Sequence, residues 1–347
     1  MASVNLLVEP CPDSLAGRSA TTRVEQSARL PGYVLLDLEE TSLGGWAAVR
    51  SLFTYRLERF QIVVDQWLVV KRGWAWCLSG GTDTVGFCED APLLEAIAET
   101  LELPDEGLSG DEIDLLPEDV ERGLQPDADG AAKALVGPAD AVLALADDAA
   151  GGEVPAARVA AARDAVAGAG GLATDELGEL LDPICDHTRA LTLQVDDHQV
   201  LGWIASDAAT MLLPDDADRA VLHRMPTAAL PVALVEQIPN TVAAPERADE
   251  PFDISPGVLA SLLASFTLPT SMTPAPSREG VVALANGLRS WWRLDIRERR
   301  GEAAPRIVEG LHTRDGPWSL VAYDRMARLE PIRPRDVFRT LCGELLS

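Results

Sequence analysis

Alternating apolar and polar positions predict β-strands in three separate stretches of the chain. The first stretch contains "RLERFQIVVDQWLVV" and "GWAWCLSGG", followed by a short third strand at "TVGF". The second is predicted to hold four strands, at about 190–196, 199–205, 208–213 and 219–225, with turn residues between them. The third contains "WWRLDIRERR", "RIVEGLHTR" and "WSLVAYD". Each stretch is therefore expected to form an antiparallel meander.

A segment with helical periodicity follows each predicted meander. The first of these helices is marked by four apolar residues: Leu93, Leu94, Ile97 and Leu101. In the second, "PTAALPVALVEQIP", we expect Thr227 to cap the helix and Pro231 to lie in its first turn. Its buried stripe is expected at Leu230, Leu234, Val235 and Ile238. The third, "RPRDVFRTLCGELL", is expected to face inward at Val337, Phe338, Leu341 and Leu345. The repeated order of meander and helix indicates an α+β fold.

Helices are also predicted before the second and third meanders. The Ala-rich run "PAARVAAARDAVAGA" predicts a helix that ends at Gly170 and Gly171, since glycine is common just beyond a helix end. A further helix is expected in "TDELGELLDPIC", with its apolar face at Leu177, Leu180, Leu181 and Ile184. The segment "SPGVLASLLASF" predicts another.

An acidic stretch divides the chain into an N-terminal and a C-terminal part. Residues 104–153 carry fourteen acids and two bases, together with Gly and Pro. We therefore predict an N-terminal meander-and-helix unit over 1–105 and an acidic linker with the entry to the next region over 106–130. An α+β domain is expected over 131–347, in two halves at about 131–239 and 251–347.

The composition indicates which kinds of partner to expect and in which compartment the protein is found. The chain has 347 residues, 47% of them hydrophobic, and its 55 acids against 29 bases give a formal charge of -26. Such a charge repels phosphate backbones and anionic membranes, so no nucleic-acid partner is expected. The sequence shows no signal-peptide pattern and no 18-residue uncharged apolar run, so we expect a cytoplasmic protein without membrane insertion. Five scattered cysteines fit reduced thiols.

One cluster of residues has metal-capable side chains: Cys185, His187, Asp196, Asp197 and His198. A hairpin could bring His187 near His198, and imidazole with carboxylate would suit zinc. Their spacing matches no known ligand pattern, however, and acids in a turn beside a histidine are typical of protein surfaces. No phosphate-binding loop or nucleophile elbow occurs in the sequence. We therefore expect no catalytic residues, no metal and no cofactor, with a metal-dependent enzyme based on this cluster as the alternative.

Tryptophan provides a different signal, because the chain has eight tryptophans and three tyrosines. Most of the tryptophans lie in predicted strands, where core packing accounts for more than half of them, but tryptophan is also enriched at interface hot spots. Along 291–297, alternation places Trp292, Leu294 and Ile296 on one face and the other four residues on the opposite face. The predicted partner-binding residues are Trp291, Arg293, Arg297 and Trp203. The alternative is that Trp291 packs at the rim of the sheet.

The order of these segments resembles the EspG family, the cytosolic chaperones of type VII (ESX) secretion in mycobacteria and related actinobacteria. The resemblance rests on "ARDAVAGAGGL", "RALTLQVDD", "RAVLHRMPTAALPVALVEQIP" and the closing strand, "RDGPW", strand and helix. It covers about residues 110–347. It implies a quasi-two-fold protein with a central antiparallel sheet and helical bundles, which binds the helical tip of PE/PPE heterodimers and keeps them soluble.

Two departures from the family bear on the identity of the client. Residues 1–105 are additional to the usual family length, and "GPWSLVAYDRMARLEP" replaces a segment that is richer in Gly and Thr in mycobacterial members. The function expected from the resemblance is a chaperone or adaptor for a secreted helical substrate, PE/PPE-like or another ESX substrate. An immunity-type or structural interaction module is a further alternative.

Overall fold

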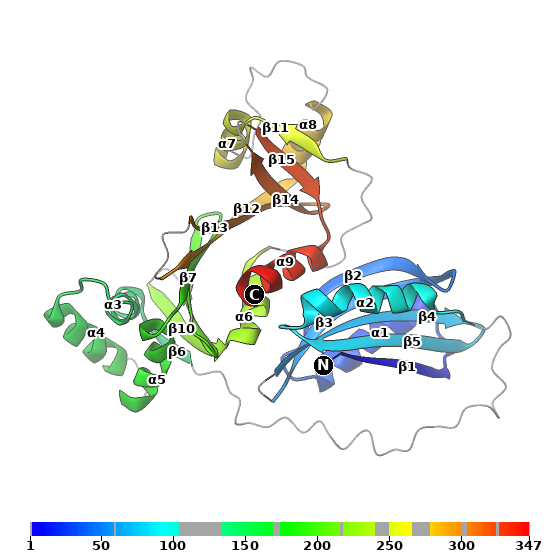
Figure 1. Ribbon diagram of the computed structural model, residues 1–347, viewed down its shortest axis with the longest axis horizontal. Helices are drawn as coiled ribbons and strands as arrows, with labels where there is room; N and C mark the ends of the chain where they lie inside the picture. The colour runs from blue at the N-terminus through cyan, green and yellow to red at the C-terminus, as the bar shows by residue number, and fades with distance from the viewer. Residues whose placement is uncertain are drawn as a thin grey trace. The chain divides into compact units, whose positions relative to one another are not determined.

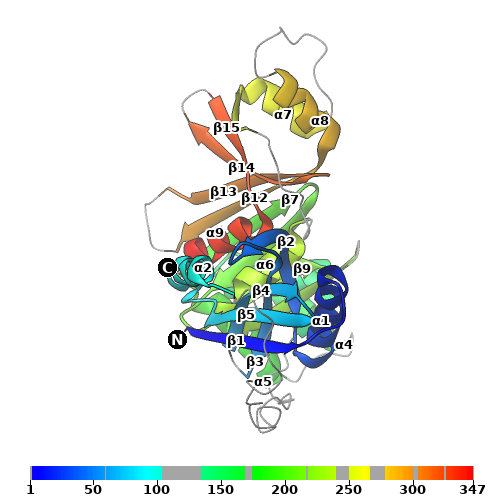
Figure 2. The same ribbon diagram turned by 90° about the vertical axis from the view of Figure 1, so that its right-hand side faces the viewer.

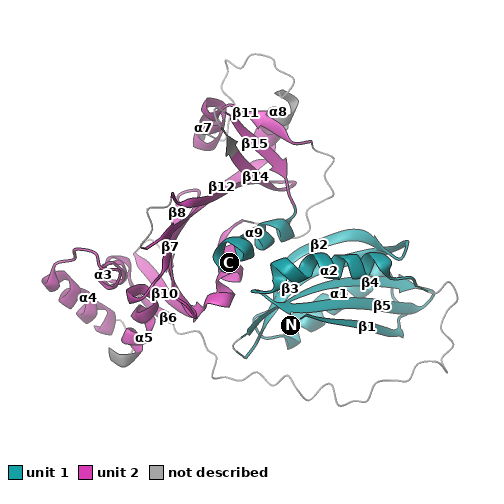
Figure 3. Cartoon of the chain, in the orientation of Figure 1, with its two compact units in different colours: residues 1–130, 241–246, 333–347 teal, residues 131–240, 247–332 magenta. Residues whose placement is uncertain are grey.

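The computed structural model describes residues 2–58, 60–103, 134–168, 174–215, 218–239, 250–265, 278–299, 304–323 and 326–346. The chain divides into two compact units, each with helices and an antiparallel sheet, which confirms the α+β prediction (Figure 1, Figure 3). Unit 1 comprises Met1–Gly130, Thr241–Glu246 and Arg333–Ser347. Unit 2 comprises Ala131–Asn240 and Arg247–Ile332. The acidic linker predicted at 106–130 lies outside the described residues.

Unit 1 is built on a five-stranded antiparallel sheet of order β1-β5-β4-β3-β2. Its strands are β1 (Ser3–Pro10), β2 (Val34–Leu43), β3 (Trp46–Leu57), β4 (Phe60–Lys71) and β5 (Trp74–Asp83). Its helices are α1 (Leu15–Arg29), α2 (Phe87–Thr100) and α9 (Pro334–Leu346). The third strand predicted at "TVGF" is wrong, because these residues form the turn into α2. The Asp83 carboxylate accepts a hydrogen bond from the Gly86 N–H there, at 2.7 Å.

The helices α1 and α2 cover opposite faces of this sheet. On one face, Leu94 of α2 packs against Gly80 of β5, where an added Cβ would lie 2.5 Å from the leucine side chain. On the other, Leu15 of α1 packs against a small cluster that contains Leu68 and Ala75. The last helix, α9, packs beside α2, since the rings of Phe338 and Phe87 lie 5.4 Å apart.

Unit 2 contains a ten-stranded sheet of order β11-β15-β14-β13-β12-β7-β8-β9-β10-β6, and every neighbouring pair is antiparallel. Its first half runs β6 (Ala134–Pro138), α3 (Ala139–Ala149), α4 (Ala156–Gly168), α5 (Thr174–Cys185), β7 (Arg189–Val195), β8 (His198–Ile204), β9 (Ala208–Pro214), β10 (Arg219–Pro226) and α6 (Leu230–Gln237). The second half runs β11 (Phe252–Ile254), α7 (Pro256–Ser265), α8 (Arg278–Gly287), β12 (Leu288–Glu298), β13 (Arg306–Thr313), β14 (Gly316–Tyr323) and β15 (Met326–Pro331).

These two halves repeat one order of elements. Each has an edge strand, then helices, then a four-stranded meander, then a closing helix, and the first strands of the two meanders, β7 and β12, pair at the centre of the sheet. The predicted four-stranded meander over 190–225 is confirmed. In the second half β15 was not predicted, and its closing helix α9 is grouped with unit 1, so the expected domain over 131–347 differs from the observed division.

The predicted helical faces are largely confirmed. The four inward residues predicted for the last helix are buried, as is the stripe of four predicted for α6. The cap assigned to Thr227 is wrong, however. Thr227 opens a 3₁₀ turn over Thr227–Ala229, and its hydroxyl donates to the Ala205 carbonyl at 3.4 Å. The α-helix starts three residues later, where Pro231 lies in its first turn as expected, because the first turn needs no N–H from proline.

Two helix groups pack on the same face of the ten-stranded sheet, at opposite ends of it (Figure 1, Figure 2). Helices α3, α4 and α5 form a core with residues of β6, β8, β9 and β10, and α7 and α8 form another with residues of β11, β13, β14 and β15. The strand register shows that this face carries Trp203 on β8, Ala190 and Thr192 on β7, and Asp295 on β12. The middle of the sheet therefore lies between two helical groups.

Candidate functional site

The candidate site is the central band, the part of this sheet face that lies between the two helix groups. Its residues are half-buried or exposed, and most of them are polar. We define the band as Thr192, Gln194, Gln199, Arg293, Asp295, Arg297, Ile307 and Glu309. They come from β7, β8, β12 and β13, which are adjacent in the sheet.

The opposite face of these strands is apolar and buried in its middle. Leu294 on β12 pairs with Leu193 on β7, and both are fully buried. The row predicted to be buried, Trp292, Leu294 and Ile296, is therefore confirmed. Because alternate residues of a strand point to opposite faces, this row fixes the remaining β12 side chains on the central band.

An arginine held by two acids lies in the middle of the band. The Arg293 guanidinium donates two hydrogen bonds to the Asp295 carboxylate, at 2.9 and 3.0 Å, and a third to Glu309 at 2.8 Å. These carboxylates raise the pKa of Arg293, so its charge is permanent. The three side chains present a fixed polar surface with one excess negative charge, which Arg297 at the exposed end of β12 balances.

Trp291 lies at the border of the band. It is half-buried and packs against the apolar core formed with α7 and α8. Its backbone is tied to the Asp196 turn, because the Trp291 N–H donates to the Asp196 carboxylate at 2.9 Å and its carbonyl accepts from the Asp196 N–H at 3.1 Å. The structure thus corresponds to the alternative in which Trp291 packs at the rim.

Trp203 is not on the exposed surface, which corrects its assignment as a partner-binding residue. It is buried in the core formed with α3, α4 and α5. In β8 it belongs to the continuous run Val200–Ile204, and such a run does not show which part of a sheet face helices cover.

The metal-capable residues of the sequence are not brought together. His187 precedes β7, whereas His198 opens β8 and pairs with Val195 at the other end of the hairpin. Seven residues of extended strand separate these two ends, about 20 Å. Within the described ranges, no group of three or more His, Cys, Asp or Glu side chains is arranged to hold a metal ion.

His187 and His198 should respond differently to replacement. His187 is buried and its Nδ1 lies 2.6 Å from the Ile184 carbonyl at the end of α5, whereas His198 is exposed. We expect His187→Ala to lower the free energy of unfolding by about 1–2 kcal/mol and His198→Ala by less than about 0.5 kcal/mol. Chemical denaturation measures both, and equal effects would contradict these assignments. Metal analysis of the purified protein is expected to find no stoichiometric zinc.

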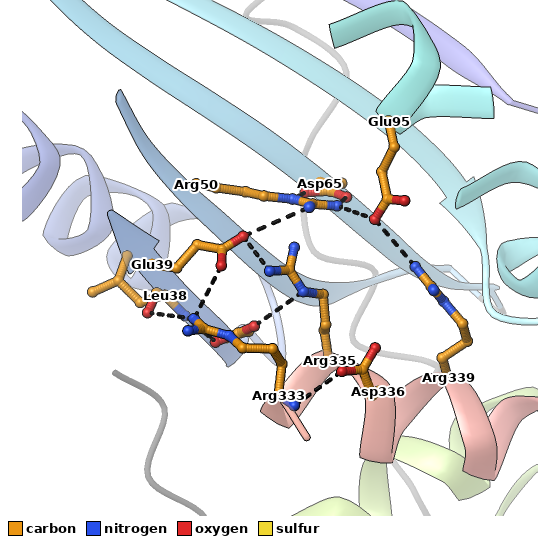
Figure 4. Close-up of polar contacts among 10 residues, drawn as sticks. Leu38, Glu39, Arg50, Asp65, Glu95, Arg333, Arg335, Asp336 and Arg339 are labelled. Carbon is orange, nitrogen blue, oxygen red and sulfur yellow. Dashed lines mark hydrogen bonds and ion pairs between the residues drawn. The ribbon is translucent and has the colours of Figure 1, made fainter. Parts of the chain in front are cut away.

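A second polar cluster, which was not predicted from the sequence, lies within unit 1 where α9 meets the sheet (Figure 4). Arg50 on β3 donates to Asp65 on β4 at 2.8 Å and to Glu95 on α2 at 2.8 Å. Three arginines from the C-terminal segment complete the cluster. Arg333 contacts Asp37 at 3.2 Å, Arg335 contacts Glu39, and Arg339 contacts Glu95 at 3.3 Å. Four arginines therefore meet four carboxylates.

Burial makes this cluster sensitive to the loss of its central pair, Arg50 and Asp65. Asp65 is 2% exposed and Arg50 is 11% exposed. Burial raises the pKa of Asp37 and of Asp65, although the neighbouring arginines act in the opposite direction. For Glu95, burial is outweighed by the hydrogen bond and charge of Arg50 and by the other arginines, so its pKa is lowered.

The raised pKa values of Asp37 and Asp65 and the lowered pKa of Glu95 have opposite effects on stability as pH changes. Asp37 and Asp65 bind protons more tightly in the folded chain than in the unfolded chain, so their contribution to stability increases as pH falls towards their raised pKa. Glu95 contributes stability above its ordinary pKa and loses it as pH falls through its lowered pKa. Mild acidification alone is therefore not expected to separate α9 from the sheet of unit 1.

Comparison with known proteins supplies no family for this chain. No family model and no curated protein matches the sequence. A Pseudomonas aeruginosa protein of unknown function, described as a putative regulator, shares 17% identity over 31% of this chain and 86% of its own, with a TM-score of 0.27. An RNA-binding light-oxygen-voltage receptor shares 13% identity over 98% of this chain and 86% of its own, with a TM-score of 0.10. Neither likeness bears on the function.

None of the helices in the described part of the chain is both long enough and apolar enough to cross a bilayer.

Proposed function

We propose that this protein is a cytoplasmic chaperone or adaptor that binds a secreted helical protein on the central band of unit 2. The proposal rests on the band of half-buried and exposed side chains between the two helix groups, while the middle of the opposite face of the same strands is buried. The quasi-repeated sheet with helices at both ends is also the arrangement that the EspG resemblance implies, and this supports a type VII secretion substrate as the client.

The chemistry of the band suits a helical protein surface. Arg293 is already held by its two carboxylates, so it is ordered before a partner arrives and loses little side-chain entropy on binding. Ile307 supplies an apolar contact that is 46% exposed, and amide side chains on β7 and β8 can donate to and accept from polar groups of the client. A net charge of -26 keeps such a complex soluble.

The proposal is tested by purifying the chain from its native host and identifying bound proteins by mass spectrometry. We expect a mostly helical secreted protein from the same genome, present in the cytoplasmic complex and free of this chain after export. Recovery of general folding chaperones alone would argue against the proposal. An immunity-type module would instead recover a toxin.

Binding should depend on the exposed part of the band. We expect the double variant Arg297→Glu, Ile307→Glu to weaken client binding by about 2 kcal/mol, because both residues face the proposed docking surface, with the unfolding free energy nearly unchanged. Calorimetric titration with the identified client measures this.

The matched control for this variant is Val321→Glu. Val321 is a similarly exposed branched residue of β14, at 50%, and lies on the opposite sheet face. It should leave affinity unchanged. If Val321→Glu weakened binding and the double variant of the central band did not, the client would bind the opposite face of the sheet. Trp291→Ser is a poorer test, since loss of its packing would destabilise the fold.

A further inference from the structure

The edge strand β1 of unit 1 is open in a way that the other sheet edges are not. In the described ranges the two sheets have four edge strands: β1, β2, β11 and β6. Of these, β2 has a bulge between Leu35 and Asp37 and carries three acids along its length. The strands β11 and β6 have three and five residues, and β6 ends in proline. Bulges, charges, prolines and short length are the usual protections of an edge against pairing with another chain.

None of these protections applies to most of β1. It has eight residues, and the run from Ser3 to Val8 carries no charge and no proline. It forms the outermost strand of the unit 1 sheet (Figure 1). Leu6 and Leu7 are 45% and 54% exposed on its two faces. An exposed, uncharged, apolar edge of this length is a template for a further strand.

We propose that β1 pairs with β1 of a second copy of this chain, antiparallel and around a two-fold axis at Leu6. A two-fold axis perpendicular to the sheet preserves the face to which each side chain points, so a residue must pair with one of the same parity. Centring at Leu6 pairs Leu6 with the partner's Leu6, Val4 with the partner's Val8, and Ser3 with the partner's Glu9. Two five-stranded sheets then become one continuous sheet.

The sequence of β1 is self-complementary in this register. Leu6, Val4 and Val8 lie on the face covered by α2, since they pair with Leu78, Gly80 and Trp76 of β5. Across the axis they would form a continuous apolar row. Each Glu9, which is bridged to Arg18 of its own chain, would face a serine and no like charge. Pro10, which lacks an N–H, stays outside the paired stretch.

The neighbouring helix extends this apolar row. Leu94 of α2 lies over Gly80, and Glu95 points towards Arg50 and Arg339. Since each helical residue turns by about 100°, Leu93 lies on the other flank of α2, towards β1. Leu93 is largely exposed in the single chain. Pairing of two copies would place Leu93 of each chain next to the new strand pair, where it can be buried. A charged or polar strand from another protein would leave Leu93 exposed.

The test is the oligomeric state of the full chain by sedimentation equilibrium across a range of concentrations. We expect a dimer whose dissociation constant rises at least about tenfold in Leu6→Lys, because two lysines would face each other across the axis. The control is Val24→Lys, which changes a residue of α1 that is 68% exposed and is not part of the paired strand, and it should leave the dimer unchanged. Circular dichroism should show both variants folded.

The register is tested separately with Leu6→Cys in a Cys185→Ser background, which removes the exposed native thiol. Under a mild chemical oxidant that accepts the two thiol electrons and protons, Leu6→Cys should form a symmetric intermolecular disulfide, and Val24→Cys should not. A monomer at all concentrations, a dimer indifferent to Leu6→Lys, or failure of the Leu6→Cys thiols to link would overturn the proposal. So would capture of a foreign strand by monomeric protein at this edge.

Discussion

Replacing Asp65 with alanine is expected to lower the free energy of unfolding of unit 1 by about 3–5 kcal/mol. The variant leaves the Arg50 guanidinium buried without the carboxylate that receives two of its N–H groups. Removing one partner of a buried ion pair costs more than the pair itself contributes, since the remaining charge stays desolvated. Hydrogen exchange of β3 and β4 amides measures the loss within unit 1 even if the two units unfold separately.

The control for this experiment is Glu25→Ala. Glu25 lies 3.8 Å from Arg18 in an ion pair at the surface of unit 1, with its side chain 47% exposed. Its removal should cost less than about 1 kcal/mol, because water screens exposed pairs. Equal effects of the two variants would show that the Arg50 cluster is solvated and does not hold α9 in place.

The second large effect is expected at Gly310, where a side chain would collide with a buried ring. An added Cβ there would lie 2.6 Å from Cε2 of Trp292, its cross-strand neighbour. Trp292 is buried and its bulky ring has little room to shift, so Gly310→Ala should lower the unfolding free energy of unit 2 by about 2–3 kcal/mol. Denaturant unfolding followed by hydrogen exchange in β12 and β13 measures it.

A double-variant cycle identifies the cause of that loss. In a Trp292→Leu background the ring is absent, so Gly310→Ala should cost clearly less than in the native background. Gly257→Ala, at a position with nothing within 4 Å of the new methyl group, should be neutral or slightly stabilising. An unchanged cost in the Trp292→Leu background would place the strain elsewhere.

The sequence predicted the elements whose period is strong and whose ends carry turn residues. The meander over 190–225 and the buried faces of α6 and α9 follow from alternation and from helical spacing, and the structure confirms them. The short strand at "TVGF" failed because four residues give too little periodicity, and the side chain of Asp83 stabilises a turn instead. The first three strands, β1, β2 and β3, and the helix α1 were not predicted.

Predicting the site requires knowing which parts of a sheet face are covered by helices, and the periodicity of the sequence does not contain this information. Trp203 and Arg293 belong to the same face, but α3, α4 and α5 cover one and leave the other open. The cluster around Arg50 had a signal that could have been recognised. Asp37 and Glu39 alternate on one face of a strand, and the arginines at 333, 335 and 339 lie near the start of the last helix. Only the three-dimensional fold brings these distant segments together.

Docking of a helical client on the central band can be measured by hydrogen exchange of the complex with the client recovered from the native host. We expect slower exchange in β7, β12 and β13 when the client binds, with the largest change around Arg293 and Ile307. Protection confined to unit 1, or no protection in these three strands at saturating client, would contradict it.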